Sequence, residues 1–155
     1  MNDLTTKKQK SARVQSKRNS EKAPLAYRNL VGSDVTDRLY KEIYERIILQ
    51  RKYLDPNYSA KVLAKELNTN TRYLSAVINS KFGVNYSSLV NSHRVRDAME
   101  MLRDPKYADL RVEDVGEYVG FSTRQCFYSA FKKFASEPPR QYRARYLSKK
   151  EAKRG

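Results

Sequence analysis

The chain carries an internal repeat, because two segments show the same pattern of apolar and polar residues 53 positions apart. Each segment has three apolar residues at helical spacing: Leu74, Val77 and Ile78 in the first, and Phe127, Ala130 and Phe131 in the second. A polar residue suited to capping a helix precedes each set, Asn70 in one case and Thr123 in the other. Each segment therefore predicts a capped amphipathic helix, and the repeat predicts that the two helices are structurally equivalent.

A second, shorter helix precedes each of these helices, and the two shorter helices match at an interval of 52 positions. The matching pairs are Leu63-Ala64 with Val115-Gly116, and Leu67-Asn68 with Val119-Gly120. The one-residue difference between the two intervals falls in the turn, where chain length changes at little cost. Each unit is thus a helix, a short turn and a capped helix, which is the plan of a helix-turn-helix.

The rest of the chain also follows helical rather than strand periodicity. Residues 37–51 repeat apolar side chains at helical spacing, and Asp55-Pro56-Asn57 then breaks the pattern. The longest predicted helix spans residues 87–102 and ends at Asp104-Pro105. After Pro138-Pro139, which ends the second unit, we expect a basic tail. Because no strand-like alternation of useful length appears, the predicted fold is all-α.

The net charge limits the classes of partner that the chain can have. Lys and Arg total 32 against 17 acidic residues, which gives a formal charge of +15. A surplus of this size favours a polyanionic partner, because phosphate contacts release condensed counterions. Nucleic acid and an anionic membrane surface both fit that description. However, no apolar run approaches the roughly 20 residues of a spanning helix, and no signal peptide opens the chain. We therefore expect a nucleic-acid partner, a cytoplasmic location and no membrane association.

The chain lacks the residues that most catalytic and metal sites need. It contains one cysteine, Cys126, and one histidine, His93. A structural zinc site usually takes about four Cys, His or carboxylate ligands, and a disulfide within the chain takes a pair of cysteines. Because a Gly-rich phosphate loop is also missing, the sequence predicts a protein that is not an enzyme and that binds no metal or cofactor.

In a helix-turn-helix the second helix enters the major groove of DNA, so its outward face should contact bases. A rotation of about 100° per residue from the apolar face gives the outward positions. The predicted base-facing residues are Arg72, Ser75, Ala76 and Asn79 in the first unit, and Arg124, Gln125, Tyr128 and Ser129 in the second. Arginine can read guanine, glutamine and asparagine can read adenine, and alanine can contact a thymine methyl group. The predicted phosphate contacts are Asn70, Thr123, Lys132, Lys133, Arg140 and Arg143.

A further set of residues forms a more specific pattern than charge and periodicity do. In the second unit it consists of Val119-Gly120-Phe121, Phe127, Phe131-Lys132-Lys133, Pro139 and Tyr142-Arg143. Upstream it consists of Leu63-Ala64, Tyr73-Leu74, Phe82-Gly83, Arg94-Val95 and Ala98. With this pattern, which covers about residues 37–147, the chain resembles the AraC/XylS family of bacterial transcription regulators.

The resemblance implies an AraC-type DNA-binding domain over residues 36–147. This domain is expected to hold two homeodomain-like helix-turn-helix subdomains, at about 59–83 and 112–136, joined by a long linker helix at about 87–102. It also implies that one polypeptide reads two successive major grooves of double-stranded DNA. RNA polymerase or a separate sensor protein is a candidate partner. No small-molecule ligand is expected, because only a short basic arm precedes the domain.

Two residues depart from the family pattern. Gly116 stands where an alanine is usual, and an interior helical glycine costs up to about 1 kcal/mol relative to alanine. Ser136 stands where a glycine is usual, which leaves a turn of positive φ to a residue that is strained there. Both departures predict that the second subdomain is the less stable one.

Alternative functions follow from the same composition. The charge and the 12 tyrosines also suit a sequence-indifferent architectural or RNA-binding protein, which needs only phosphate contacts and stacking aromatic rings. A protein-interaction module is a third class, although it would not need polar outward faces at matched positions. The basic arm, residues 1–35, either contacts DNA or is a linker, and residues 148–155 are expected to form the basic tail.

Overall fold

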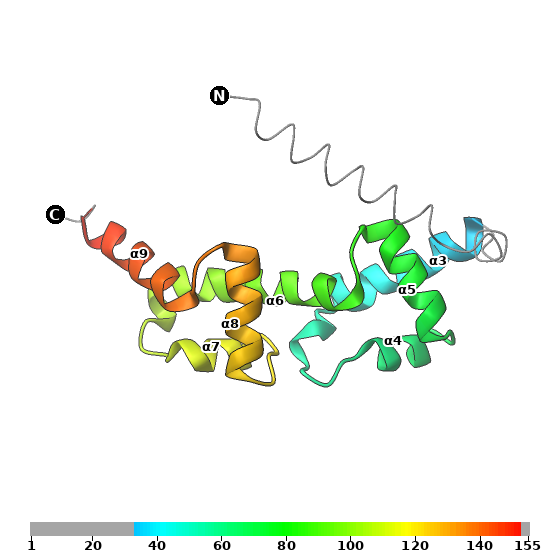
Figure 1. Cartoon of the computed structure of the whole chain (residues 1–155), viewed down its shortest axis with the longest axis horizontal. Helices are drawn as coiled ribbons and strands as arrows, with labels where there is room; N and C mark the ends of the chain where they lie inside the picture. Colours follow the sequence, from blue (N-terminus) through cyan, green and yellow to red (C-terminus); the bar gives the residue numbers. More distant parts are fainter. Residues whose placement is uncertain (1–32, 153–155) are drawn as a thin grey trace, which may run out of the picture. The chain divides into compact units, whose positions relative to one another are not determined.

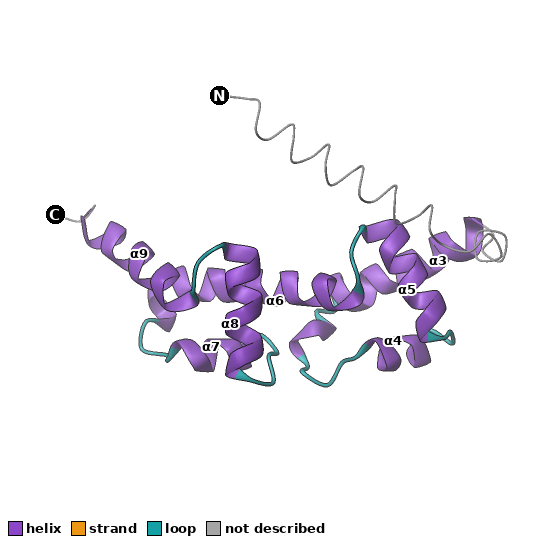
Figure 2. Cartoon of the chain, in the orientation of Figure 1, coloured by secondary structure: helices purple, strands orange, loops and turns teal. Residues whose placement is uncertain are grey.

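The computed structural model describes residues 33–152, and every regular element within that range is helical (Figures 1 and 2). The predicted all-α fold is therefore confirmed. The chain divides into two compact units. Within the described range, the first unit comprises residues 33–45 and 60–86, and the second comprises residues 46–59 and 87–152.

The described part of the first unit consists of α3 (Ser33–Tyr44), α4 (Ala60–Glu66) and α5 (Thr71–Phe82). Helices α3 and α4 both pack against α5. Their buried side chains are Leu39 and Ile43 of α3, Leu63 and Ala64 of α4, and Leu74, Val77 and Ile78 of α5. The apolar face predicted for the second helix of the repeat thus lies in the interior of this unit, and α4, the turn and α5 form the first helix-turn-helix.

The second unit takes in most of a π-helical segment (Glu45–Leu49) and a short 3₁₀ turn (Lys52–Leu54). Its longer helices are α6 (Tyr86–Arg103), α7 (Val112–Tyr118), α8 (Arg124–Ala135) and α9 (Pro139–Ala152), with a 3₁₀ turn at Pro105–Tyr107. The core combines Val95, Ala98 and Leu102 of α6, Val112 and Val115 of α7, Val119 and Phe121 of the turn, Phe127, Ala130 and Phe131 of α8, and Tyr142 of α9. Helices α7 and α8 form the second helix-turn-helix.

The turns of the two helix-turn-helix units contain equivalent backbone hydrogen bonds. In the first, the Thr69 N–H donates to the Ala64 carbonyl over 2.9 Å. In the second, the Phe121 N–H donates to the Gly116 carbonyl over 3.0 Å. The residue before each donor has positive φ, 50° at Asn68 and 98° at Gly120. The repeat read from the sequence is therefore a repeat of backbone conformation.

Both second helices begin and end in the same way. The Asn70 side chain accepts a hydrogen bond from the Tyr73 N–H over 2.8 Å, and the Thr123 hydroxyl accepts one from the Cys126 N–H over 3.1 Å. These bonds confirm the two predicted caps. After each helix the chain turns through the left-handed region, with φ of 72° at Gly83 and 63° at Ser136. Ser136 thus occupies the positive-φ turn that its position predicts.

Residues 46–59 belong to the second unit because α6 and the turn before α8 hold their backbone. The Arg94 guanidinium donates to the Tyr53 carbonyl over 2.6 Å and to the Asp55 carbonyl over 3.1 Å. On another side, a Cβ atom at Gly120 would lie 2.6 Å from the Tyr53 carbonyl oxygen and 2.7 Å from that of Leu54. Glycine is therefore required at position 120 by both its φ angle and its neighbours.

Three expected boundaries differ from the structure. Helix α3 already begins at Ser33, inside the expected basic arm, of which residues 1–32 lie outside the described range. It ends at Tyr44 and continues as a π-helical segment to Leu49 instead of as one helix to residue 51. The chain also does not leave the fold as a tail after Pro138: α9 spans Pro139–Ala152.

Helix α9 forms because Pro139 can start a helix and Tyr142 can complete the core. Proline suits the first helical position, where its missing N–H would have had no partner within the helix. The Tyr142 side chain is 2% exposed, and its ring centroid lies 5.4 Å from that of Phe131. Because Tyr142 is the one residue of the described α9 among the buried hydrophobic core residues, this helix gives little periodic signal in the sequence.

Gly116 has a packing role that the sequence does not reveal. A Cβ atom built there would lie 2.6 Å from Cδ1 and 2.7 Å from Cγ of Phe127. At the matching positions of the first unit, Ala64 lies on α4 and Leu74 on α5, and both side chains are buried. In the second unit, glycine thus replaces alanine, and the larger phenylalanine replaces leucine. Gly116 therefore makes room for the Phe127 ring, and its effect is not only a loss of helix propensity.

We expect Gly116→Ala to destabilise the protein by up to about 2 kcal/mol, because overpacking costs about 1–3 kcal/mol and the gain in helix propensity returns roughly 1 kcal/mol. In a Phe127→Leu background the same substitution should cost less, because leucine removes most of the ring, although it keeps Cγ. Urea unfolding of the wild type, the single variants and the double variant measures this difference. A loss of the same size in both backgrounds would show that Phe127 is not the obstacle.

Candidate nucleic-acid interface

The predicted base-facing residues of the first unit lie on the accessible side of α5. Arg72 and Asn79 are exposed, and Ser75 and Ala76 are half-buried. The opposite side of α5 is buried, since the relative exposure of Leu74, Val77 and Ile78 does not exceed 2%. The cap at Asn70 fixes where the helix begins, and the buried face fixes the direction in which these four side chains point.

Helix α8 repeats this arrangement in the second unit. Arg124, Gln125 and Ser129 are exposed, and Tyr128 is half-buried. The predicted phosphate contacts Thr123, Lys132 and Lys133 are exposed as well. The outward face of α8 therefore presents cationic, amide and hydroxyl groups, the types that hydrogen-bond to base edges and phosphates. Contact of these residues with DNA stays a prediction.

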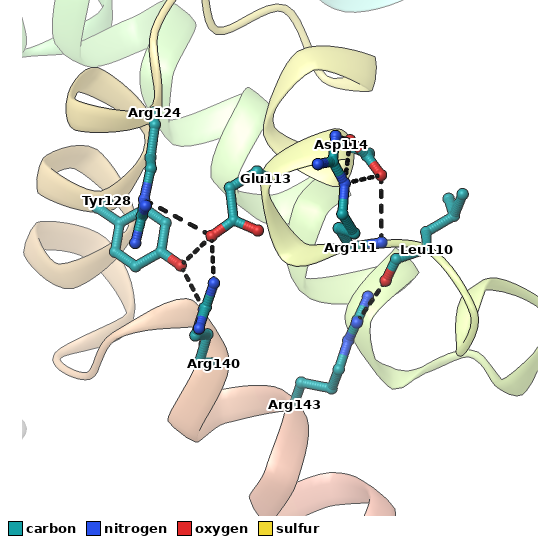
Figure 3. A network of polar contacts seen from close by, with 8 residues as sticks. All are labelled: Leu110, Arg111, Glu113, Asp114, Arg124, Tyr128, Arg140 and Arg143. Atoms are coloured by element: carbon teal, nitrogen blue, oxygen red, sulfur yellow. Dashed lines mark hydrogen bonds and ion pairs between the residues drawn. The ribbon is translucent and has the colours of Figure 1, made fainter.

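A network centred on Glu113 of α7 reaches the outward face of α8 (Figure 3). The Tyr128 hydroxyl donates to Glu113 Oε1 over 2.9 Å, and Arg140 Nη2 donates to the same oxygen over 2.7 Å. Arg140 Nε in turn donates to the Tyr128 hydroxyl over 3.0 Å. Arg124 Nε lies 3.6 Å from Glu113 Oε1, and the Arg124 guanidinium stands 5.0 Å from the centroid of the Tyr128 ring.

These contacts favour the ionised form of Glu113. The hydrogen bond from Arg140, a bond from the glutamate's own backbone N–H and the Tyr128 hydroxyl lower the pKa of Glu113 to about 2. The same carboxylate raises the pKa of Arg140. Glu113 is therefore charged at any pH at which the protein would meet DNA, and it neutralises part of the positive face that α8 and α9 present.

Arg143, a predicted phosphate contact, is engaged by the protein itself. Its guanidinium donates to the Leu110 carbonyl over 2.6 Å and to the Tyr107 carbonyl over 3.4 Å (Figure 3 shows the first bond). Partial burial lowers the pKa of this guanidinium. Arg143 thus ties α9 to the loop that precedes α7.

Glu113 is the residue of this surface that sequence reasoning missed. An acidic residue in the first turn of a helix is ordinary, because it interacts favourably with the helix dipole. Nothing local to α7 indicates that its carboxylate would meet side chains 11 to 27 positions further along the chain. The sequence gives no separate signal for this contact.

The described residues also bear on metal binding and membrane insertion. Within residues 33–152, no group of three or more His, Cys, Asp or Glu side chains lies together as a metal site would need. The His93 ring stacks on that of Tyr53, with centroids 5.4 Å apart, and Cys126 is exposed on α8. In the same range, no helix combines the length and apolar character that crossing a membrane requires.

A comparison with protein families gives one relevant match. A family model described as a helix-turn-helix domain matches residues 63–145, a range that begins in α4 and ends in α9. The match therefore spans both helix-turn-helix units and the helix between them. No curated protein matches the chain in sequence.

Solved structures with the same fold include domains of bacterial response regulators. The C-terminal domain of AraT, a response regulator from Geobacillus stearothermophilus, is 28% identical with a TM-score of 0.59, covering 66% of this chain and 83% of that one. The C-terminal domain of the two-component response regulator yesN from Fusobacterium nucleatum is 29% identical with a TM-score of 0.60, covering 67% and 97%. A Listeria innocua protein of unknown function, 24% identical with a TM-score of 0.61, covers 68% and 94% and shows the fold alone.

Proposed function

The chain belongs to the AraC-type helix-turn-helix family of DNA-binding transcription regulators, and from this we propose that it recognises a specific double-stranded DNA sequence. Each unit inserts its second helix, α5 or α8, into a major groove. The two helices read two successive grooves, so that one polypeptide covers a site made of two short boxes.

The observation that carries this proposal is the equivalence of α5 and α8. Both helices follow the same hydrogen-bonded turn, both begin with a side-chain cap, and both bury one face and expose polar groups on the other. In the first unit we assign Arg72 to a guanine, and in the second we assign Gln125 to an adenine. The excess of Lys and Arg supplies the phosphate contacts and the attraction at long range.

The burial of several tyrosines weighs against a sequence-indifferent binder. Such a protein stacks bases on exposed aromatic rings. In the described part of the chain, Tyr53, Tyr58 and Tyr142 are instead buried, with relative exposures of 4%, 6% and 2%. Tyr40 packs against Tyr44 and Phe82. The three buried rings therefore belong to the interior of the second unit.

Selection of bound duplexes from random DNA tests the proposal. We expect an enriched site, bound at least about 10³-fold more tightly than a scrambled duplex of the same length. Affinity for both duplexes should fall as salt rises, with a log–log slope of about 0.9 for each phosphate contacted. A specific-to-scrambled ratio near one would instead support an architectural or RNA-binding protein.

The remaining partners follow from the same proposal. A regulator acts on transcription through RNA polymerase, and the signal that it answers comes either from its own abundance or from a separate sensor protein. A cytoplasmic location is consistent with both. These three statements stay predictions, and co-purification of the full chain with RNA polymerase from cells that express it tests the first.

A further inference from the structure

The Glu113 network exists in one of the two repeated units only. In the first unit, the positions that match Glu113, Arg124, Tyr128 and Arg140 hold different residues. They are Lys61, Thr71, Ser75 and Ser87. None of these side chains is a carboxylate, and the position that matches Glu113 is a lysine. The units therefore share backbone geometry but differ in the electrostatics beside the second helix.

Within the network, one carboxylate oxygen organises three groups from two helices. Glu113 Oε1 accepts from Tyr128 and from Arg140, and lies within 3.6 Å of Arg124. The Tyr128 ring is held through its hydroxyl, and the Arg124 guanidinium lies over this ring, 5.0 Å from its centroid. Arg124 and Arg140 remain 64% and 62% exposed, so both are within reach of solvent and of a bound duplex.

We propose that Glu113 is a positioning residue that gives the second unit its base selectivity at the expense of its affinity for the DNA backbone. The proposal rests on the function proposed above. An arginine side chain is long and flexible, and a guanidinium that is held by no partner can neutralise a phosphate on any sequence. Held beside Tyr128, Arg124 instead meets DNA in one position, which favours a particular base pair.

Competition is the second part of this effect. Phosphate and carboxylate bind guanidinium through the same charge-assisted hydrogen bonds. A phosphate that binds the N–H groups of Arg140 or Arg124 that face Glu113 therefore competes with this carboxylate, which then loses that partner. On non-specific DNA, where few base contacts form, this displacement lowers affinity without any compensating gain.

The test compares Glu113→Gln with Glu117→Gln. Both substitutions remove one negative charge from α7, but Glu117 is exposed and belongs to no part of the network. In Glu113→Gln we expect tighter binding to scrambled duplex and relaxed base preference in the second box alone. The log–log salt slope should steepen by about 0.9 for each guanidinium that turns to a phosphate. In Glu117→Gln the base preferences of both boxes should stay as in the wild type.

Tyr128→Phe is the second variant, because it removes only the hydroxyl that bridges Glu113 and Arg140. It should relax the same base pairs as Glu113→Gln, while the preference of the first box stays unchanged. Circular dichroism confirms that each variant is folded. If Glu113→Gln and Glu117→Gln bind all duplexes alike, the proposal is wrong. If the wild type itself shows no preferred site, it is the proposed function that fails.

Discussion

Replacing Arg72 with alanine should relax base preference in one half of the DNA site, and replacing Gln125 with alanine should relax it in the other half. Each loss should be about 1–3 kcal/mol, the contribution of a good bidentate contact to discrimination between bases. Because the two residues belong to separate compact units, the losses should add. The double variant should then lose roughly 2–6 kcal/mol of discrimination, close to non-specific binding.

The measurement is the affinity of each variant for a series of duplexes in which every base pair is changed in turn. Arg38→Ala is the matched control for Arg72, since it removes the same exposed group from α3 of the same unit. Gln141→Ala, exposed on α9, is the control for Gln125. Both controls should leave base preference unchanged.

The arrangement of the two boxes gives an independent check. One turn of DNA is about 10 base pairs, so inserting about five base pairs between the boxes turns one of them to the opposite face of the duplex. Binding to this site should fall to the level of a single box. Relaxation of the same base pairs by both substitutions, or no effect of the insertion, would contradict the assignment of two recognition helices.

Gly120→Ala should destabilise the second unit by about 2–5 kcal/mol. The left-handed backbone costs a residue with a Cβ about 1–2 kcal/mol, and overpacking adds about 1–3 kcal/mol. The overpacking arises because the new methyl group would lie 2.6 Å from the Tyr53 carbonyl oxygen, where neither backbone can move alone. Urea unfolding gives the free energy, and hydrogen exchange of residues 46–59 shows whether this segment detaches.

Asn68→Ala is the control for this prediction, because Asn68 occupies the matching turn of the first unit with φ of 50°. Asparagine already tolerates that conformation, and alanine there should lose on the order of 1 kcal/mol. Equal losses for the two variants would mean that φ alone, and not the approach of residues 53 and 54, explains the glycine.

The repeat, the helix types and the capping residues could be read from the sequence because they depend on contacts that are close along the chain. A cap such as Asn70 or Thr123 bonds to an N–H three residues away, and an apolar face repeats within one or two turns. For the same reason the sequence identified which side of α5 and α8 is exposed. It also gave the charge that indicates a polyanionic partner.

Tertiary structure alone decided the features that join distant residues. Residues 46–59 pack with the second unit because Arg94 and Gly120 hold their backbone, 39 to 67 positions away. Helix α9 follows from the burial of Tyr142 against Phe131, and the need for glycine at position 116 follows from Phe127.

Glu113 shows the same limit at the candidate site. Its type and its place in the first helical turn are visible in the sequence, but its role depends on Arg124, Tyr128 and Arg140, which only the folded chain brings to it. Periodicity and capping are rules about neighbours in sequence, whereas side-chain packing and charge pairing depend on neighbours in space. The sequence by itself therefore determined the two capped second helices, and the tertiary structure decided which side chains lie together beside them.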